Sequence, residues 1–194
     1  MSWSDAHLTP EGVSQAVTLS AFWTALFEKG APFPDTIYSS PLTRCLQTTK
    51  HIWAPICQSR GAPFHPLIKE LLREQITDHT CDRRSPRARL AEDFPEFLFE
   101  EGFAETDTLW RADRWEPLPE HCARKQAVLE DLFRRDEGAC LSLSVHSFAI
   151  AVIMAVCDAE MYRVREGTSL ALLVKAEEVD EPPTFDVGER LVGY

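Results

Sequence analysis

The chain of 194 residues has no apolar run approaching the roughly 20 residues that a membrane-spanning helix needs. Its first residues, MSWSDAHLTPEG, lack the basic and then apolar pattern of a secretory signal. The six cysteines are scattered, without the CxxC or Cys/His spacing of zinc sites. We therefore expect a cytoplasmic protein, or a nuclear one, with reduced thiols and no bound metal.

Positive charge is also scarce. Against 31 Asp and Glu residues stand 20 Lys and Arg residues, so the formal net charge is −11 at pH 7. This charge disfavours nucleic acid and anionic membranes as partners. The basic residues at 83, 84, 87 and 89 form a local cluster with two interpretations, a site for a small anionic ligand or a solvated loop.

Helical and strand patterns alternate along the chain, which favours one α/β domain with helices on both faces of a sheet. We expect strands over 36–39, 66–72, 140–145 and 169–174, and helices over 10–29, 41–56, 120–135 and 148–157. Ser40 and Ser147 are the expected caps of the helices that follow them. The segment 169–174 is almost continuously apolar, which is typical of a central parallel strand.

The expected domain covers residues 1–176, and 177–194 form an acidic tail. Within the domain, residues 73–119 (the insert) are polar and aromatic with weak periodicity. We expect short helices and loops there, lying over one side of the domain. Substrate-shaping contacts often come from such segments.

Two residues lie where predicted strands lead into predicted helices. Arg44 falls in the first helical turn after the strand 36–39, and His146 directly follows the strand 140–145. Helix N-termini attract anions through free N–H groups and the helix dipole. An Arg and a His at two such positions suggest a phosphate site.

Four segments in order resemble the histidine phosphatase superfamily, the phosphoglycerate-mutase-like proteins. They are DAHLTPEGVSQA (5–16), SSPLTRCLQT (39–48), LLREQITDHTCDRRS (71–85) and SVHS (144–147). The third, with FPEF, EEGF and DTLW downstream, resembles a branch found in fungi and plants. The resemblance implies a three-layer α/β/α sandwich that acts as a phosphatase or phosphomutase on a small phosphorylated molecule, without a cofactor or metal.

The resemblance also implies roles for individual residues. Arg44 would clamp the phosphoryl oxygens with charge-assisted bonds. Glu74 would protonate the leaving oxygen, which requires a raised pKa, and His146 would stabilise the transferred phosphoryl group. Further substrate contacts are expected from Arg73, Arg83, Arg84 and Ser147.

The chain departs from the family pattern in two places. The family's first strand ends in Arg-His-Gly, whose histidine accepts the phosphoryl group, and this tripeptide is absent from the 194 residues. Because that strand lies in the middle of the family's sheet, we expect a sandwich whose first strand is missing. Phe148 stands where relatives carry Gly or another small residue, and its ring would either narrow the anion site or shape a larger pocket.

Three hypotheses follow from these departures. The first is a phosphatase whose chain, as given, begins downstream of its nucleophile. The second is a repurposed enzyme that uses Arg44, Glu74 and His146 for acid–base chemistry on a non-phosphorylated small molecule. The third is a non-catalytic phosphate-binding protein. Each of these hypotheses is compatible with a homodimer.

Overall fold

The computed structural model describes residues 4–160 and 164–178. Among them, four parallel strands form a sheet in the order β3-β2-β1-β4. The strands are β1 (Thr36–Ser39), β2 (Leu67–Ile68), β3 (Leu98–Phe99) and β4 (Leu141–Ser144). The α-helices are α1 (Pro10–Glu28), α2 (Thr43–Arg60), α3 (Arg87–Asp93), α4 (Leu118–Arg135) and α5 (Ser147–Val156). Short 3₁₀ helices cover Glu70–Leu72 and Thr80–Asp82.

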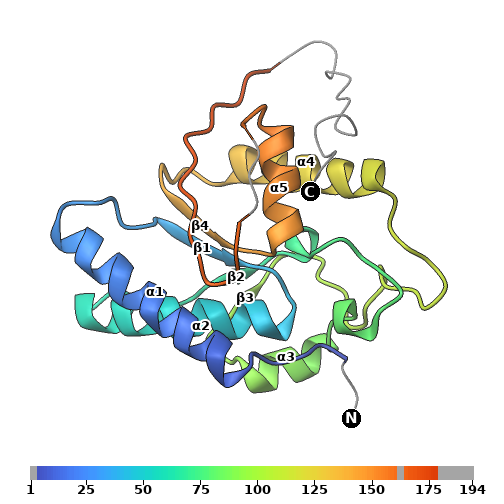
Figure 1. Ribbon diagram of the computed structural model, residues 1–194, viewed down its shortest axis with the longest axis horizontal. Coiled ribbons are helices and arrows are strands. Elements are labelled where there is room, and N and C mark those ends of the chain that lie inside the picture. The colour runs from blue at the N-terminus through green and yellow to red at the C-terminus, as the bar shows by residue number, and fades with distance from the viewer. Residues whose placement is uncertain (1–3, 161–163, 179–194) are drawn as a thin grey trace.

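Helices cover both faces of this sheet, with α1, α2 and α3 below it and α4 and α5 above it in the view of Figure 1. Alternate side chains of β1 explain the two layers. Ile37 packs into the core formed with α1 and α2, whereas Tyr38 packs with Val128 and Leu132 of α4. The predicted three-layer α/β/α class is confirmed.

The carboxyl ends of β1 and β4 lie side by side, and this edge positions the site. Ser39 pairs with Ser144 in parallel register, and the N–H of Ser40 donates to the Ser144 carbonyl over 3.0 Å. Soon after each strand the chain enters a helix, α2 or α5. Both helix N-termini therefore lie beside the same edge, where α/β proteins usually bind their ligands.

The two predicted serine caps are wrong. Helix α2 begins at Thr43, and its first N–H donates to the Asp5 carboxylate over 2.7 Å instead of to Ser40. Ser147 is the first residue of α5, and His146 occupies the N-cap position. A carboxylate from a distant segment replaces the local cap, so the hydroxyl of Ser40 is available for another contact.

The insert contains more regular structure than its weak periodicity indicates. It includes the 3₁₀ helix Thr80–Asp82, helix α3 and strand β3, which pairs with β2. Two-residue strands are too short to show a period, which is why β3 was not predicted. For the same reason the predicted strand 66–72 was too long, since only Leu67–Ile68 pair before the chain turns into a 3₁₀ helix.

The predicted strand 169–174 is wrong. Residues 164–178 carry neither helix nor strand, and Leu173 is fully exposed at 104%. Within the described residues β4 pairs with β1 alone and forms an edge of the sheet. An apolar segment becomes a strand only when its backbone hydrogen-bonds to a neighbouring strand, and 169–174 pair with none of the described strands, the free edge of β4 included. No described strand precedes α1 either.

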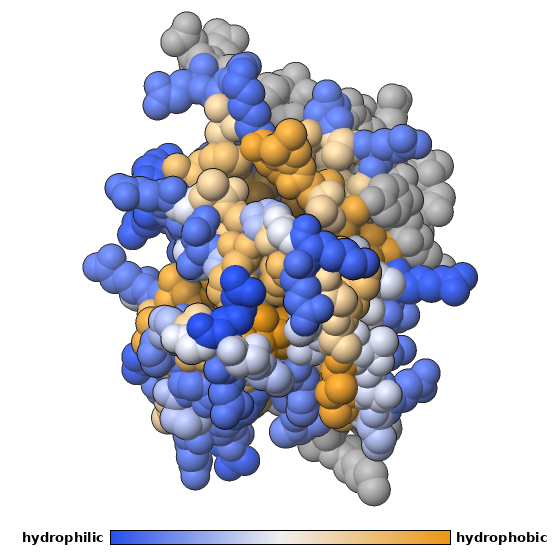
Figure 2. Space-filling view, turned by 90° about the vertical axis from the view of Figure 1, so that its left-hand side faces the viewer, coloured by the Kyte–Doolittle hydropathy of each residue, from blue (hydrophilic) through white to orange (hydrophobic). Residues whose placement is uncertain are grey.

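One face of the molecule shows apolar residues gathered over its middle and upper parts, among charged ones (Figure 2). Packing of the described residues thus leaves apolar side chains in contact with solvent. None of the described helices has both the length and the apolar character needed to cross a bilayer. The predicted domain limits stay a prediction, and the predicted tail lies outside the described residues from 179 onward.

Candidate active site

Arg44, Glu74 and His146 come together between the N-termini of α2 and α5. Arg44 is the second residue of α2, and His146 immediately precedes α5. Glu74 reaches α5 from the insert, where its Oε2 accepts a hydrogen bond from the N–H of Phe148 over 3.2 Å. Burial raises the pKa of Glu74 and lowers that of His146; the charge of Arg44 opposes the first shift and adds to the second, so the three groups lie within electrostatic reach.

His146 is buried against the strand ends. Its Nε2 lies 2.9 Å from Ser40 Oγ and 3.5 Å from Cys45 Sγ. Burial, and then the positive charges of Arg44 and Lys125, lower the pKa of His146 well below its ordinary value. The imidazole is therefore neutral at pH 7, with one N–H donor and one lone pair.

The pKa of Glu74 is shifted in the opposite direction. Burial raises the pKa of its carboxyl, although the N–H groups of Gln75 and Phe148 and the charge of Lys125 oppose the rise. A carboxyl group with a raised pKa can hold a proton and release it to a leaving group. This direction matches the role that the family resemblance implies.

Arg44 is held by the insert. Its Nη1 donates to the Cys81 carbonyl over 2.8 Å, and its Nη2 lies 3.4 Å from Asp82 Oδ1. The guanidinium remains about a quarter exposed, at 26%. It can therefore present further N–H groups to an anion while the insert fixes its direction.

Two cations of α4 hold the backbone beside Glu74. Arg124 donates to the carbonyls of Arg73 (2.9 Å) and Glu74 (2.8 Å). Lys125, fully buried, donates to the carbonyls of Leu71 (2.7 Å) and Arg73 (2.5 Å). Neither residue was predicted from the sequence. The signal was available, because Arg124 and Lys125 share the helical spacing of the buried Val128 and Leu132.

Phe148 rests on a second buried histidine. Its ring stacks on His121, with centroids 5.5 Å apart and planes 6° apart. The Nδ1 of His121 lies 3.0 Å from Glu116 Oε2, and burial lowers the pKa of this histidine to about 4. A cleft of about 90 Å³ opens beside this pair, lined by Ile76, Leu109, Arg114, Glu116, Glu120 and Arg124.

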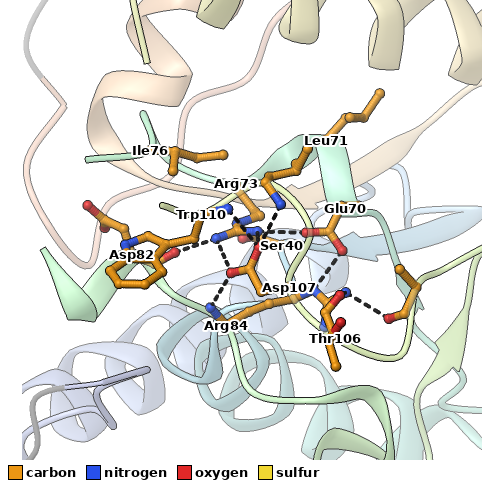
Figure 3. Close-up of polar contacts among 12 residues, drawn as sticks. Ser40, Glu70, Leu71, Arg73, Ile76, Asp82, Arg84, Thr106, Asp107 and Trp110 are labelled. Atoms are coloured by element: carbon orange, nitrogen blue, oxygen red, sulfur yellow. Dashed lines mark hydrogen bonds and ion pairs between the residues drawn. The ribbon is translucent and has the colours of Figure 1, made fainter. Parts of the chain in front are cut away.

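Arg73 and Arg84 belong to the buried network of Figure 3, and the charge of Arg73 also helps to lower the pKa of His146, after burial and the charges of Arg44 and Lys125. Arg73 forms ion pairs with Glu70 and Asp107, each at 2.8 Å. Arg84 pairs with Glu70 at 2.7 Å, and its backbone N–H donates to Asp107 over 2.9 Å. These guanidinium groups are engaged inside the protein, where they fasten the insert to the 3₁₀ helix beside β2.

The other two predicted substrate contacts are exposed. Arg83 places its guanidinium 5.2 Å from the centroid of the Trp110 ring, on the surface of the insert. Ser147 lies next to His146 at the start of α5. Of the four, Arg73 and Ser147 are adjacent in sequence to residues of the central cluster, Glu74 and His146, and Ser147 is the exposed one of the two.

Comparison with known proteins gives a consistent result. The family model described as histidine phosphatase superfamily (branch 1) matches residues 1–170. A probable phosphoglycerate mutase of Arthroderma benhamiae is 36% identical over 196 residues, covering 100% of this chain and 58% of that protein. Phosphomutase-like protein 3 of Candida albicans is 31% identical over 178 residues, covering 90% of this chain and 54% of that protein.

A solved structure supports the same fold. The ecdysone phosphate phosphatase of Bombix mori, crystallised with tungstate, has a TM-score of 0.51 and 15% identity. The match covers 94% of this chain and 78% of that one. This chain spans only about half the length of the curated relatives described above, 58% and 54%.

Proposed function

The chain belongs to the histidine phosphatase superfamily (branch 1), and from that premise we propose that it binds a small phosphorylated molecule between the N-termini of α2 and α5. Its proposed activity is that of a phosphoglycerate-mutase-like phosphatase or phosphomutase. The observation that carries this proposal is the convergence of Arg44, Glu74 and His146 on one edge of the sheet. The printed names of the fungal relatives support the reaction class.

The chemistry assigned to each group follows from its surroundings. The guanidinium of Arg44 balances the negative charge of the phosphoryl oxygens. The neutral His146 donates its N–H to the same oxygens and stabilises the charge that builds up in the transition state. As the bond between phosphorus and the leaving oxygen breaks, Glu74 transfers its proton to that oxygen.

A second candidate is phosphate binding without turnover. The printed sequence has no Arg-His-Gly, the element whose histidine accepts the phosphoryl group in relatives. In that case Arg44 and His146 would hold a phosphorylated ligand, and no covalent intermediate would form. Binding and turnover therefore need separate measurements.

The proposal also covers the class of ligand and the cellular compartment. The net charge of −11 supports a small anionic ligand rather than nucleic acid, because a basic surface is needed for the latter. All six cysteines are free thiols, which supports a reducing cytoplasmic or nuclear environment.

The test measures phosphate release from p-nitrophenyl phosphate and from sugar and nucleotide phosphates. We expect R44A and H146N to lose turnover of all substrates. We expect E74Q to lose turnover of the alkyl phosphates but to retain much of it on p-nitrophenyl phosphate, whose leaving group departs without a proton. R89A is the matched control, because Arg89 lies on the exposed face of α3 and pairs with Asp93.

Binding is measured in parallel as the thermal shift produced by inorganic phosphate. A shift in the wild type that disappears in R44A, without turnover of any substrate, supports the binding protein. If R44A and H146N match the wild type in both binding and turnover, the proposed site is wrong.

A further inference from the structure

The polar side chain closest to His146 is not one that the family resemblance assigned. The hydroxyl of Ser40, the thiol of Cys45 and the imidazole of His146 form a buried triangle beneath the candidate site. Ser40 Oγ lies 2.9 Å from His146 Nε2. Cys45 Sγ lies 3.5 Å from the same nitrogen and 3.8 Å from Nδ1.

The position of Ser40 is fixed by the sheet. Its N–H continues the ladder between β1 and β4 by donating to Ser144 over 3.0 Å. Ser39, the residue before it, is held by Thr49, whose hydroxyl donates to Ser39 Oγ over 3.0 Å. The backbone of Ser40 is therefore held in place by the sheet. Its hydroxyl can in turn fix the orientation of the His146 imidazole.

Proton positions in the triangle follow from acceptor strength. Burial raises the pKa of the Cys45 thiol to about 12, so the sulfur keeps its proton. That thiol lies 3.6 Å from the Val145 carbonyl, which can only accept. The Ser40 proton then faces either sulfur, a weak acceptor, or the imidazole nitrogen, a strong one. Donation to Nε2 satisfies the buried hydroxyl, whereas the reverse bond would leave its hydrogen facing a poor acceptor.

A neutral imidazole that accepts at Nε2 carries its proton on Nδ1. Among the described residues, Nδ1 lies near the Cys45 sulfur, at 3.8 Å. Within that part of the chain this N–H has no strong acceptor, and a phosphoryl oxygen would supply one.

We propose that Ser40 is a positioning residue that holds His146 in the Nδ1–H tautomer, so that Nδ1 is the atom that donates to a bound phosphate. The assignment of the tautomer stands on the geometry of the triangle. The step to phosphate rests on the proposed function, and the two are tested by separate readouts.

The first readout is the nitrogen NMR spectrum of the histidine side chains in the whole chain near neutral pH, with H146N used to assign the signals. We expect wild-type His146 to show a protonated Nδ1 and an unprotonated Nε2. S40A should give a mixture of both tautomers, and S40T should restore the wild-type pattern. S39A is the matched control, because it removes a buried hydroxyl one residue away whose contacts are with Ser40 O and Thr49 Oγ1 rather than with His146.

A wild-type spectrum with the proton on Nε2, or an S40A spectrum identical to that of the wild type, would overturn the tautomer assignment. The spectrum of S40A also shows directly whether the variant is folded. If S40A is unfolded, S40C replaces it, since a thiol fits the site but is a poor donor.

The second readout is the response to inorganic phosphate. We expect the Nδ1–H signal of His146 to shift on titration of the wild type, and S40A to bind phosphate several-fold more weakly. If turnover is present, kcat should fall more than KM changes in S40A, and S40T should recover it. A protein with the expected tautomer but no phosphate response would retain the Ser40 assignment and contradict the proposed function.

Discussion

The carboxylate of Asp5 accepts hydrogen bonds from both the backbone N–H of Thr43, at 2.7 Å, and its hydroxyl, at 2.8 Å. Its second oxygen also accepts from the N–H of Ser85, at 2.9 Å. One side chain thus caps α2 and ties the insert to it. The Asp that opens the first family-like segment fixes the helix that carries Arg44.

Replacement of Asp5 by Ala should destabilise the protein by about 1–3 kcal/mol, because a helix cap and a buried N–H partner are lost together. D5N, which retains one accepting oxygen, should fall between D5A and the wild type. Urea unfolding with an unchanged slope provides the measurement. E11A removes an exposed acid from the first turn of α1 and serves as the control. A midpoint for D5A equal to that of E11A would contradict the capping role.

Replacement of Lys125, unlike that of Asp5, should not lower the stability of the protein. Its buried ammonium donates to carbonyls of Leu71 and Arg73, and both carbonyls also accept from Arg124 Nη1, at 3.1 and 2.9 Å. Burial lowers the pKa of Lys125 well below its ordinary value, which indicates that burying the charged ammonium is unfavourable. K125M removes that cost while the carbonyls keep a donor, so the urea midpoint should stay equal or rise.

The contrasting variant is R124M. It leaves Glu116 without the guanidinium that contacts it at 2.6 Å, and an uncompensated buried charge of this kind costs about 3–5 kcal/mol. A large loss of stability in K125M would show that the ammonium, rather than Arg124, holds the backbone at Glu74.

The pH dependence of stability should report on His121. Its pKa is lowered to about 4 by burial in the folded state, against an ordinary value of 6.5. Between these values the unfolded chain binds the proton and the folded protein does not, so stability falls as the pH drops below 6.5. At pH 5.5 the loss from this histidine is about 1 kcal/mol, and the contribution becomes negligible above about pH 7.5.

The measurement compares the wild type with H121Q in urea at pH 7.5 and at pH 5.5. His146, whose pKa is lowered too, contributes in both proteins and cancels. Whatever the absolute stability of H121Q, its loss over this interval should be about 1 kcal/mol smaller than that of the wild type. Equal losses would mean that His121 is protonated alike in the folded and unfolded states.

Local sequence patterns correctly predicted helices whose start is determined by neighbouring residues. Helix α1 begins after Thr9 as expected, because the cap, the proline and the first turn are adjacent in sequence. The three central residues of the candidate site were predicted from strand ends, for Arg44 and His146, and from family-like segments, for all three. What the sequence could not show is which distant partner a residue meets. Asp5 caps α2, and Lys125, whose burial its helical spacing does indicate, contacts the backbone near Glu74.

The wrong prediction of a strand at 169–174 has the same cause. An apolar pattern indicates that a segment would gain from burial, but a strand forms only beside another strand with free backbone groups. The sequence shows the first condition and says nothing of the second. In the described residues β4 remains an edge, and 169–174 do not pair with it.

Leu173 gives the most direct test of this arrangement. Because its side chain is fully exposed, L173S should change the free energy of unfolding by less than about 0.5 kcal/mol. L143S is the matched comparison, since Leu143 lies on β4 against the core around Tyr38 and should cost about 2–4 kcal/mol. If 169–174 were a central strand, both variants would be similarly destabilised. A loss of more than about 2 kcal/mol in L173S would therefore place this segment in the core.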